Sequence, residues 1–342
     1  MEPLPAAPDE ADARFATRFR ARAGGDGPVS FADFMELALF DPQIGYYTAA
    51  RERVGKGRGT DFYTSSTFAG VFGPLVAAAA EALLGGRAPA ASHTFVEIGS
   101  EPERALLAGA PQAFAAVRAF GLTDHLTCGD PRLPDRAVVF SNELFDAQPF
   151  HRLIWRDGAW REQGVALHGG GLAWAELPGL SPELDPVRPE LPVSSENGYI
   201  LDVPWRAVRL LRALTAGSWQ GLFLAFDYGR TWRQISEDFP GGTGRAYAAH
   251  RQSSDLLAMP GRQDLTCHVC WDWLERALRD AGFVPVRRDS QESFLVRNAT
   301  AAIEAIVRAE PNPLASRRSQ LKQVLHPGLL GQRFEVLWGL RR

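Results

Sequence analysis

The order of apolar segments in the centre of the chain is the feature that most limits its fold. Runs typical of β-strands occur at residues 94–98, 115–120, 137–140 and 221–226. Segments with helical periodicity lie before, between and after them, at 69–84, 103–110, 204–216 and 271–281. Strands that alternate with helices form a mostly parallel sheet with helices on its faces. We therefore expect an α/β fold.

Two further regions predict additions to this sheet. Residues 283–286 and 293–296 are expected to form a closing pair of strands, which would give the sheet an antiparallel edge. Residues 150–200 are expected to leave the sheet as a β-hairpin region, because Asp157-Gly158 is a turn signal between two strand-like runs.

The N-terminal region is expected to be helical. Residues 12–24 and 31–40 favour helices, and Ser30 with Asp33 forms a capping box before the second one. On a scale of ~150 residues per domain, 342 residues suggest two domains or one large domain with an insertion. We expect a helical region at 1–68 that packs on a core domain at 69–342, with the hairpin region inserted at 150–200.

Charge and apolar content argue against several kinds of partner. The net charge of −3 provides no general attraction for nucleic acid or for an anionic membrane. The longest apolar stretch, 73–84, contains Glu81 and is shorter than the ~20 residues that span a bilayer. The N-terminus does not have the pattern of a signal peptide, and 3 cysteines suit a reducing compartment. We expect a cytoplasmic protein with no nucleic-acid partner and no membrane insertion.

Polar residues follow the expected strands at the points where each strand ends. In open α/β sheets, ligands bind beyond the carboxyl ends of the strands. Asn142, Glu143 and Asp146 follow one apolar strand, and Asp227 follows another. These acids could equally cap turns and helices. As functional groups, they would project at the carboxyl edge of the sheet, where a ligand binds.

A metal site is not expected. Cys267 and Cys270 form a lone Cys-x-x-Cys pair, and the sequence has no second pair that would complete a set of four zinc ligands.

Eight segments, taken in order, resemble a known family. They include Val-Glu-Ile-Gly at 96–99, Ser-Asn-Glu-Leu-Phe-Asp-Ala at 141–147 and Phe-Asp-Tyr-Gly at 226–229. The others lie at 29–47, 61–65, 245–251, 263–269 and 331–337. The ordered set resembles the MidA-like S-adenosylmethionine-dependent methyltransferases, a family that includes the mitochondrial arginine methyltransferase assisting complex I assembly.

The resemblance implies a Rossmann-like class I methyltransferase fold, S-adenosylmethionine as cofactor and a protein side chain, such as arginine, as acceptor. The residues that would act in catalysis are Glu143, Asp146 and His250. The residues that would bind the cofactor are Thr64, Ser65, Glu97, Gly99, Asn142 and Asp227. The resemblance implies a protein substrate or partner and no particular oligomeric state.

The chain departs from the family pattern at the cofactor loop. Glu101 and Glu103 stand where the family has glycines, and Ser100 with Glu103 forms a capping box. Glycine permits the close approach of backbone to ligand, so these two acids are expected to make cofactor binding weak or absent. The second strand also ends at Gly121, with Asp124 as the nearest acid for a ribose contact.

Two other functions are compatible with these departures. The chain could be a cofactor-free relative that serves as a protein-binding or assembly module, or an enzyme with a small-molecule acceptor. The 44 residues from Gly99 to Asn142 are also too few for complete helical crossovers of about 30 residues each, so at least one helix should be shortened or absent.

Overall fold

The computed structural model describes residues 10–48, 68–100, 105–107, 113–121, 124, 133–193, 196–249, 251–312 and 314–342. The chain forms two compact units. The first unit comprises Met1–Arg51, Ala147–Ala207 and Thr231–His268. The second comprises Glu52–Asp146, Val208–Arg230 and Val269–Arg342. The domain boundary expected at residue 68 stays a prediction.

The second unit is built around a six-stranded sheet. Its strands are β2 (Thr94–Ile98), β3 (Ala116–Phe120), β4 (Arg136–Asn142), β9 (Gln220–Asp227), β15 (Val286–Ser290) and β16 (Glu335–Arg341). They lie in the order β15-β16-β9-β4-β2-β3. The strands from β9 to β3 are parallel, and β16 is antiparallel to both β9 and β15. The expected α/β fold, mostly parallel with an antiparallel edge, is confirmed.

The antiparallel edge uses a different strand from the one expected. The prediction of a strand at 293–296 is wrong, because these residues belong to helix α8 (Gln291–Asn298). The Ser290 side chain accepts a hydrogen bond from the N–H of Ser293 and caps this helix, while Phe294 and Leu295 are buried. The strand expected at 283–286 lies at Val286–Ser290 (β15) instead, and its partner is the C-terminal strand β16. A short apolar run does not distinguish a strand from a buried helix by periodicity.

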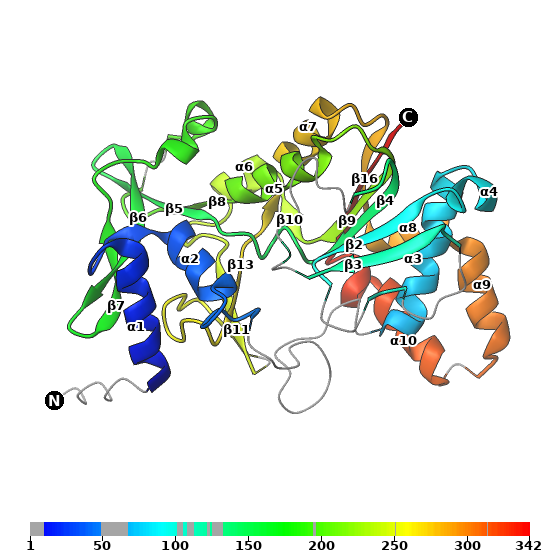
Figure 1. The fold of residues 1–342 in the computed structure, drawn as a ribbon, viewed down its shortest axis with the longest axis horizontal. Coiled ribbons are helices and arrows are strands. Elements are labelled where there is room, and N and C mark those ends of the chain that lie inside the picture. The colour runs from blue at the N-terminus through cyan, green and yellow to red at the C-terminus, as the bar shows by residue number, and fades with distance from the viewer. Residues whose placement is uncertain are drawn as a thin grey trace. The chain divides into compact units, whose positions relative to one another are not determined.

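Helices cover the sheet of the second unit (Figure 1). They are α3 (Ala69–Leu83), α4 (Arg87–Ala90), α7 (Trp271–Asp280), α8, α9 (Thr300–Ala309) and α10 (Ser316–Leu325). Helices α3, α8, α9 and α10 share one apolar core with alternate residues of the strands. In that core the ring of Phe226 on β9 lies 5.1 Å from Phe72 and 5.5 Å from Phe294. Beside the sheet, the short strands β10 (Gly229–Arg230) and β14 (Val269–Cys270) pair in parallel.

The connections between β2, β3 and β4 are short. The helix expected at 103–110 falls largely outside the described residues, and none of the described residues that join these three strands is helical. No helix in the described part of the chain is long and apolar enough to cross a membrane. The expected cytoplasmic location stays a prediction.

The first unit contains an antiparallel sheet of five strands. They are β1 (Val29–Ser30), β5 (His151–Arg156), β6 (Ala159–His168), β7 (Gly171–Glu176) and β8 (Ile200–Val203). The turn between β5 and β6 is formed by Asp157 and Gly158, with φ values of 50° and 76°. Positive φ at both central residues matches the right-handed twist of the strands. The expected hairpin region is therefore confirmed.

Helices and a smaller sheet complete the first unit. The helices are α1 (Glu10–Ala23), α2 (Phe31–Phe40), α6 (Trp232–Glu237) and the first turn of α5 (Trp205–Thr215). The second sheet has the order β12-β11-β13 and consists of β11 (Arg245–Ala248), β12 (Arg251–Ser253) and β13 (Asp264–Thr266). Ser30 accepts a hydrogen bond from the N–H of Asp33, as the expected N-cap of α2 requires.

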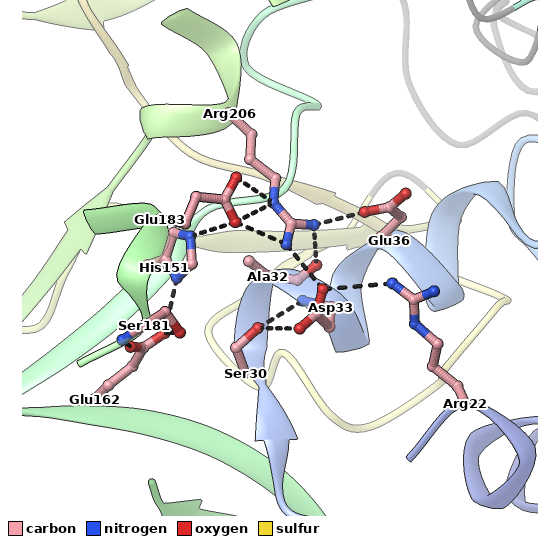
Figure 2. Close-up of polar contacts among 10 residues, drawn as sticks. All are labelled: Arg22, Ser30, Ala32, Asp33, Glu36, His151, Glu162, Ser181, Glu183 and Arg206. Atoms are coloured by element: carbon pink, nitrogen blue, oxygen red, sulfur yellow. Dashed lines mark hydrogen bonds and ion pairs between the residues drawn. The ribbon is translucent and has the colours of Figure 1, made fainter. Parts of the chain in front are cut away.

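A network of charged side chains lies within the first unit (Figure 2). His151 on β5 contacts Glu162 through Nδ1 at 2.7 Å and Glu183 through Nε2 at 3.2 Å. Glu183 also accepts from Arg206 at 3.1 Å, and Arg206 bonds Asp33 of α2 at 2.8 Å. Because each bond joins a different element, the network ties helix α2 to the hairpin region.

Candidate active site

The strand order of the second unit produces a topological switch point at the carboxyl edge of the sheet. From β2 the chain continues to β3 on one side, whereas β4 lies on the other side of β2 and leads on to β9. Ile98 is paired with Ser141, so the loops that follow β2 and β4 leave the sheet next to each other. This is the position at which open α/β sheets bind ligands. Gly99, Asn142 and their neighbours therefore define the candidate site.

The loop after β2 turns over the end of β3. Gly99 has a φ of 82°, a conformation that glycine adopts without a steric penalty. The N–H groups of Gly99 and Ser100 both donate to the carbonyl oxygen of Phe120, at 2.8 and 3.0 Å. Glu101 and Glu103 lie outside the described residues, so their expected effect on the cofactor stays a prediction.

Glu97 lies on strand β2, before this loop begins. Its side chain is on the same face of β2 as Phe95, and it is buried. Burial raises the pKa of Glu97 to about 7, although the hydrogen bond from Leu106 acts in the opposite direction. The Glu97 Oε2 atom accepts from the N–H of Leu106 at 2.6 Å, which anchors the segment that follows the loop. Its cofactor-binding role stays a prediction.

An acid does stand at the end of β3. The Oδ2 atom of Asp124 accepts from the N–H of Gly121 at 2.6 Å, so the carboxylate folds back onto the last residues of the strand. In the sequence, Asp124 is only the nearest acid after the end of this strand. The tendency of aspartate to bond backbone groups in turns is the signal that could have placed it here.

Two buried oxygen atoms at the end of β4 have no hydrogen-bond partner within the described part of the chain. They are Oγ of Ser141 and Oδ1 of Asn142, while the Asn142 amide donates to Glu143 at 3.0 Å. Buried polar atoms normally have partners, so these two oxygens can accept hydrogen bonds from a water or from a bound ligand. Ser141 was not expected as a site residue; its signal is a hydroxyl in an otherwise apolar strand.

Three acids gather where β4 and β9 end. Asp146 and Asp227 are almost completely buried, with exposed fractions of 2% and 0%. Burial, and next the charge of Asp146, raise the pKa of Asp227 well above its usual range, and Glu143 adds a smaller rise. The expected acids Glu143, Asp146 and Asp227 are therefore brought together. These carboxyl groups suit a cationic group such as a guanidinium, whose charge would favour their ionised forms.

Three other residues are predicted from the sequence to belong to the site. Thr64, Ser65 and His250 all fall on residues that the structure does not describe. The thiols of Cys267 and Cys270 are both buried. Among the described ranges, no group of three or more His, Cys, Asp or Glu residues could hold a metal ion.

Residues 101–287 match the model of a family described as "putative S-adenosyl-L-methionine-dependent methyltransferase". The chain belongs to this family. The match spans more than half of the sequence and includes the ends of β4 and β9, where the acids gather. The resemblance to MidA-like methyltransferases is confirmed, and S-adenosylmethionine is the cofactor of the family.

Two mitochondrial arginine methyltransferases are similar to this chain along most of their length. The mitochondrial protein arginine methyltransferase NDUFAF7 of Danio rerio is 24% identical over 373 residues, which cover 90% of this chain and 82% of the relative. The NDUFAF7 protein of Homo sapiens is 25% identical over 375 residues, covering 90% and 79%.

A solved structure shows the same fold. A COG1565 superfamily member from Burkholderia thailandensis, bound to S-adenosylhomocysteine, matches with a TM-score of 0.80 and 23% sequence identity. The match covers 99% of this chain and 95% of that one. The expected Rossmann-like methyltransferase fold is thereby confirmed, while the individual site residues stay predictions.

Proposed function

We propose that this methyltransferase family member transfers a methyl group from S-adenosylmethionine to an arginine side chain of a protein. The observation that supports this proposal most is the acid cluster of Glu143, Asp146 and Asp227 beside the switch point. An arginine acceptor is positively charged in water, and carboxylates are the groups that bind it with bidentate geometry. The NDUFAF7 relatives are named protein arginine methyltransferases, which supports the same acceptor.

The cofactor would be held at the ends of β2, β3 and β4. Gly99 would allow its close approach, and the buried oxygens of Ser141 and Asn142 would accept hydrogen bonds from it. Asp124 stands where a ribose hydroxyl could donate to a carboxylate. When bound, S-adenosylmethionine supplies a methyl group on a positively charged sulfonium, which is already a good electrophile.

The acceptor would be oriented by the acids that follow β4. The Glu143 carboxylate would hold the guanidinium by charge-assisted hydrogen bonds, and the nearby Asp146 would add negative charge. An arginine nitrogen must lose a proton as it gains a methyl group. His250 is the base that we expect to accept that proton. Correct placement of the acceptor supplies much of the acceleration in such a reaction.

A two-step experiment tests this function. Calorimetric titration with S-adenosylmethionine and S-adenosylhomocysteine measures cofactor binding, over concentrations high enough for the weak affinity expected from Glu101 and Glu103. Incubation with tritiated S-adenosylmethionine and a cell extract, followed by acid hydrolysis, then identifies the methylated residue. We expect label in methylarginine.

The other outcomes favour the other functions. Absence of binding at millimolar ligand would favour the cofactor-free protein-binding module. Label confined to small molecules would favour an enzyme with a small-molecule acceptor.

A further inference from the structure

One buried carboxylate joins the two chain segments that leave the sheet beside the candidate site. Asp227 is the last residue of β9, and its Oδ1 atom accepts from the N–H of Tyr228 at 2.9 Å. Its Oδ2 atom accepts from the N–H of Phe145 at 2.9 Å and, at a longer distance of 3.4 Å, from that of Asp146. The side chain of Asp227 therefore fixes the turn at 143–146 against the end of its own strand.

The turn that Asp227 fixes begins with a residue in an unfavourable conformation. Glu143 has a φ of 54°, in the left-handed region that residues other than glycine rarely adopt. Its N–H donates to the carbonyl oxygen of Phe226 at 2.9 Å, so the ladder between β4 and β9 extends one residue past β4. Strained backbone of this kind persists only where its surroundings hold it in place. The bonds to Asp227 supply that restraint on the C-terminal side of Glu143.

The chemistry of these bonds requires a carboxyl group at position 227. An aspartate has two acceptor oxygens, and both face backbone N–H groups. An asparagine would turn its amide N–H₂ toward one of these donors and lose that bond. The side chain is fully buried, with an exposed fraction of 0%, so its oxygens face the protein backbone rather than open solvent.

We propose that Asp227 is a positioning residue, which holds the turn at 143–146 so that Glu143 lies at the carboxyl edge of the sheet, and that it does not contact the cofactor. This differs from the cofactor-binding role expected from the sequence. The role of Glu143 in orienting an acceptor rests on the proposed function. The restraint that Asp227 places on the turn at 143–146 does not, and it can be measured without any substrate.

Amide exchange in the isolated protein measures the restraint. In Asp227→Asn, we expect at least one of the amides of Phe145 and Tyr228, the one that faces the new amide N–H₂ group, to exchange roughly 10- to 100-fold faster than in the unaltered protein, because it loses its acceptor. Asp289→Asn is the matched control, since Asp289 on β15 accepts hydrogen bonds from Arg297 and Trp338 at the other edge of the sheet. In that variant the two amides should exchange at their original rates. Unchanged exchange in Asp227→Asn would overturn the proposal.

Titration with S-adenosylhomocysteine separates positioning from cofactor contact. A positioning role predicts that Asp227→Asn binds this ligand within about threefold of the unaltered protein, a difference below 1 kcal/mol. A loss of affinity of tenfold or more with unchanged amide exchange would make Asp227 a cofactor ligand instead. If the unaltered protein does not bind the ligand at all, the proposed function fails, and the exchange measurement still decides whether Asp227 restrains the turn.

A second pair of variants keeps Asp227 and tests the same turn. Glu143→Gly and Glu143→Ala remove the same carboxylate but differ in their tolerance of positive φ. If the turn is held in its left-handed conformation, the glycine variant should melt about 2–4 °C above the alanine variant. Equal or reversed melting temperatures would show that the turn is not restrained, and the proposal would fall.

Discussion

The carboxylate of Glu143 is the single group on which the proposed reaction depends most. Glu143→Gln keeps the size of the side chain but removes the negative charge that would orient a guanidinium. We expect methyl transfer to fall roughly 100-fold or more, while the free energy of unfolding changes by less than ~0.5 kcal/mol. Initial rates with tritiated S-adenosylmethionine and thermal melting measure the two effects.

A control variant separates the loss of the Glu143 carboxylate from the general effect of removing an acidic side chain. Glu81→Gln changes a partly exposed acid on α3 and should leave the methylation rate unchanged. Full methylation by Glu143→Gln would remove Glu143 from the catalytic role.

A second residue-scale prediction concerns pH and Glu97. Its folded-state pKa of about 7 is above the unfolded value of 4.5, so between these two values the folded protein keeps a proton that the unfolded chain has lost. Stability from this group is therefore full below about pH 4.5 and declines until about pH 7, by up to about 3 kcal/mol. Glu97→Gln cannot titrate and should flatten this part of the curve of unfolding free energy against pH. Identical slopes for both proteins would contradict the assignment.

At the scale of elements, the charged network of the first unit should make the contact between α2 and the hairpin region depend on pH. Burial lowers the pKa of His151, but hydrogen bonds from its ring to Glu162 and Glu183 outweigh this, so the pKa is raised (Figure 2). Both ring nitrogens face carboxylates, so the charged imidazolium is the form that satisfies them.

Because the pKa of His151 is raised in the folded state, the unfolding free energy falls as the pH rises. A histidine whose pKa is higher in the folded state contributes its stability fully below the unfolded value of 6.5. The contribution is lost as the pH rises through the folded-state pKa. We expect the unaltered protein to lose more unfolding free energy between pH 6.5 and higher pH than His151→Gln does. Urea unfolding of both proteins at several pH values measures this, and parallel curves would exclude His151 as the source.

At the scale of the whole molecule, the expected weakness of cofactor binding depends on two residues of one loop. Glu101→Gly with Glu103→Gly restores the glycines of the family pattern and removes two carboxylates. We expect S-adenosylmethionine to bind the double variant at least about tenfold more tightly, which corresponds to about 1.4 kcal/mol. Calorimetry on the intact chain measures the change. Tight binding by the unaltered protein that is lost in the variant would show instead that the two acids are cofactor ligands.

Local features of the sequence determined most of the elements. Apolar runs placed β2, β4 and β9, Asp157-Gly158 placed the hairpin turn, and Ser30 placed the start of α2. These predictions succeed because periodicity, turn conformation and capping depend on residues that are near one another in the chain. The sequence also indicated Asn142, Glu143, Asp146 and Asp227 as site candidates, since polar residues after buried strands lie at the carboxyl edge of a parallel sheet.

Only the tertiary structure decided how distant segments combine. The pairing of β16 with β9 joins residues more than 100 positions apart, and no local pattern encodes that pairing. The same holds for Asp227, whose raised pKa depends on complete burial beside Asp146, 81 residues away in the chain. Burial and the charges around a group are properties of the packed molecule, so the sequence could nominate the acids but only the fold could bring them together.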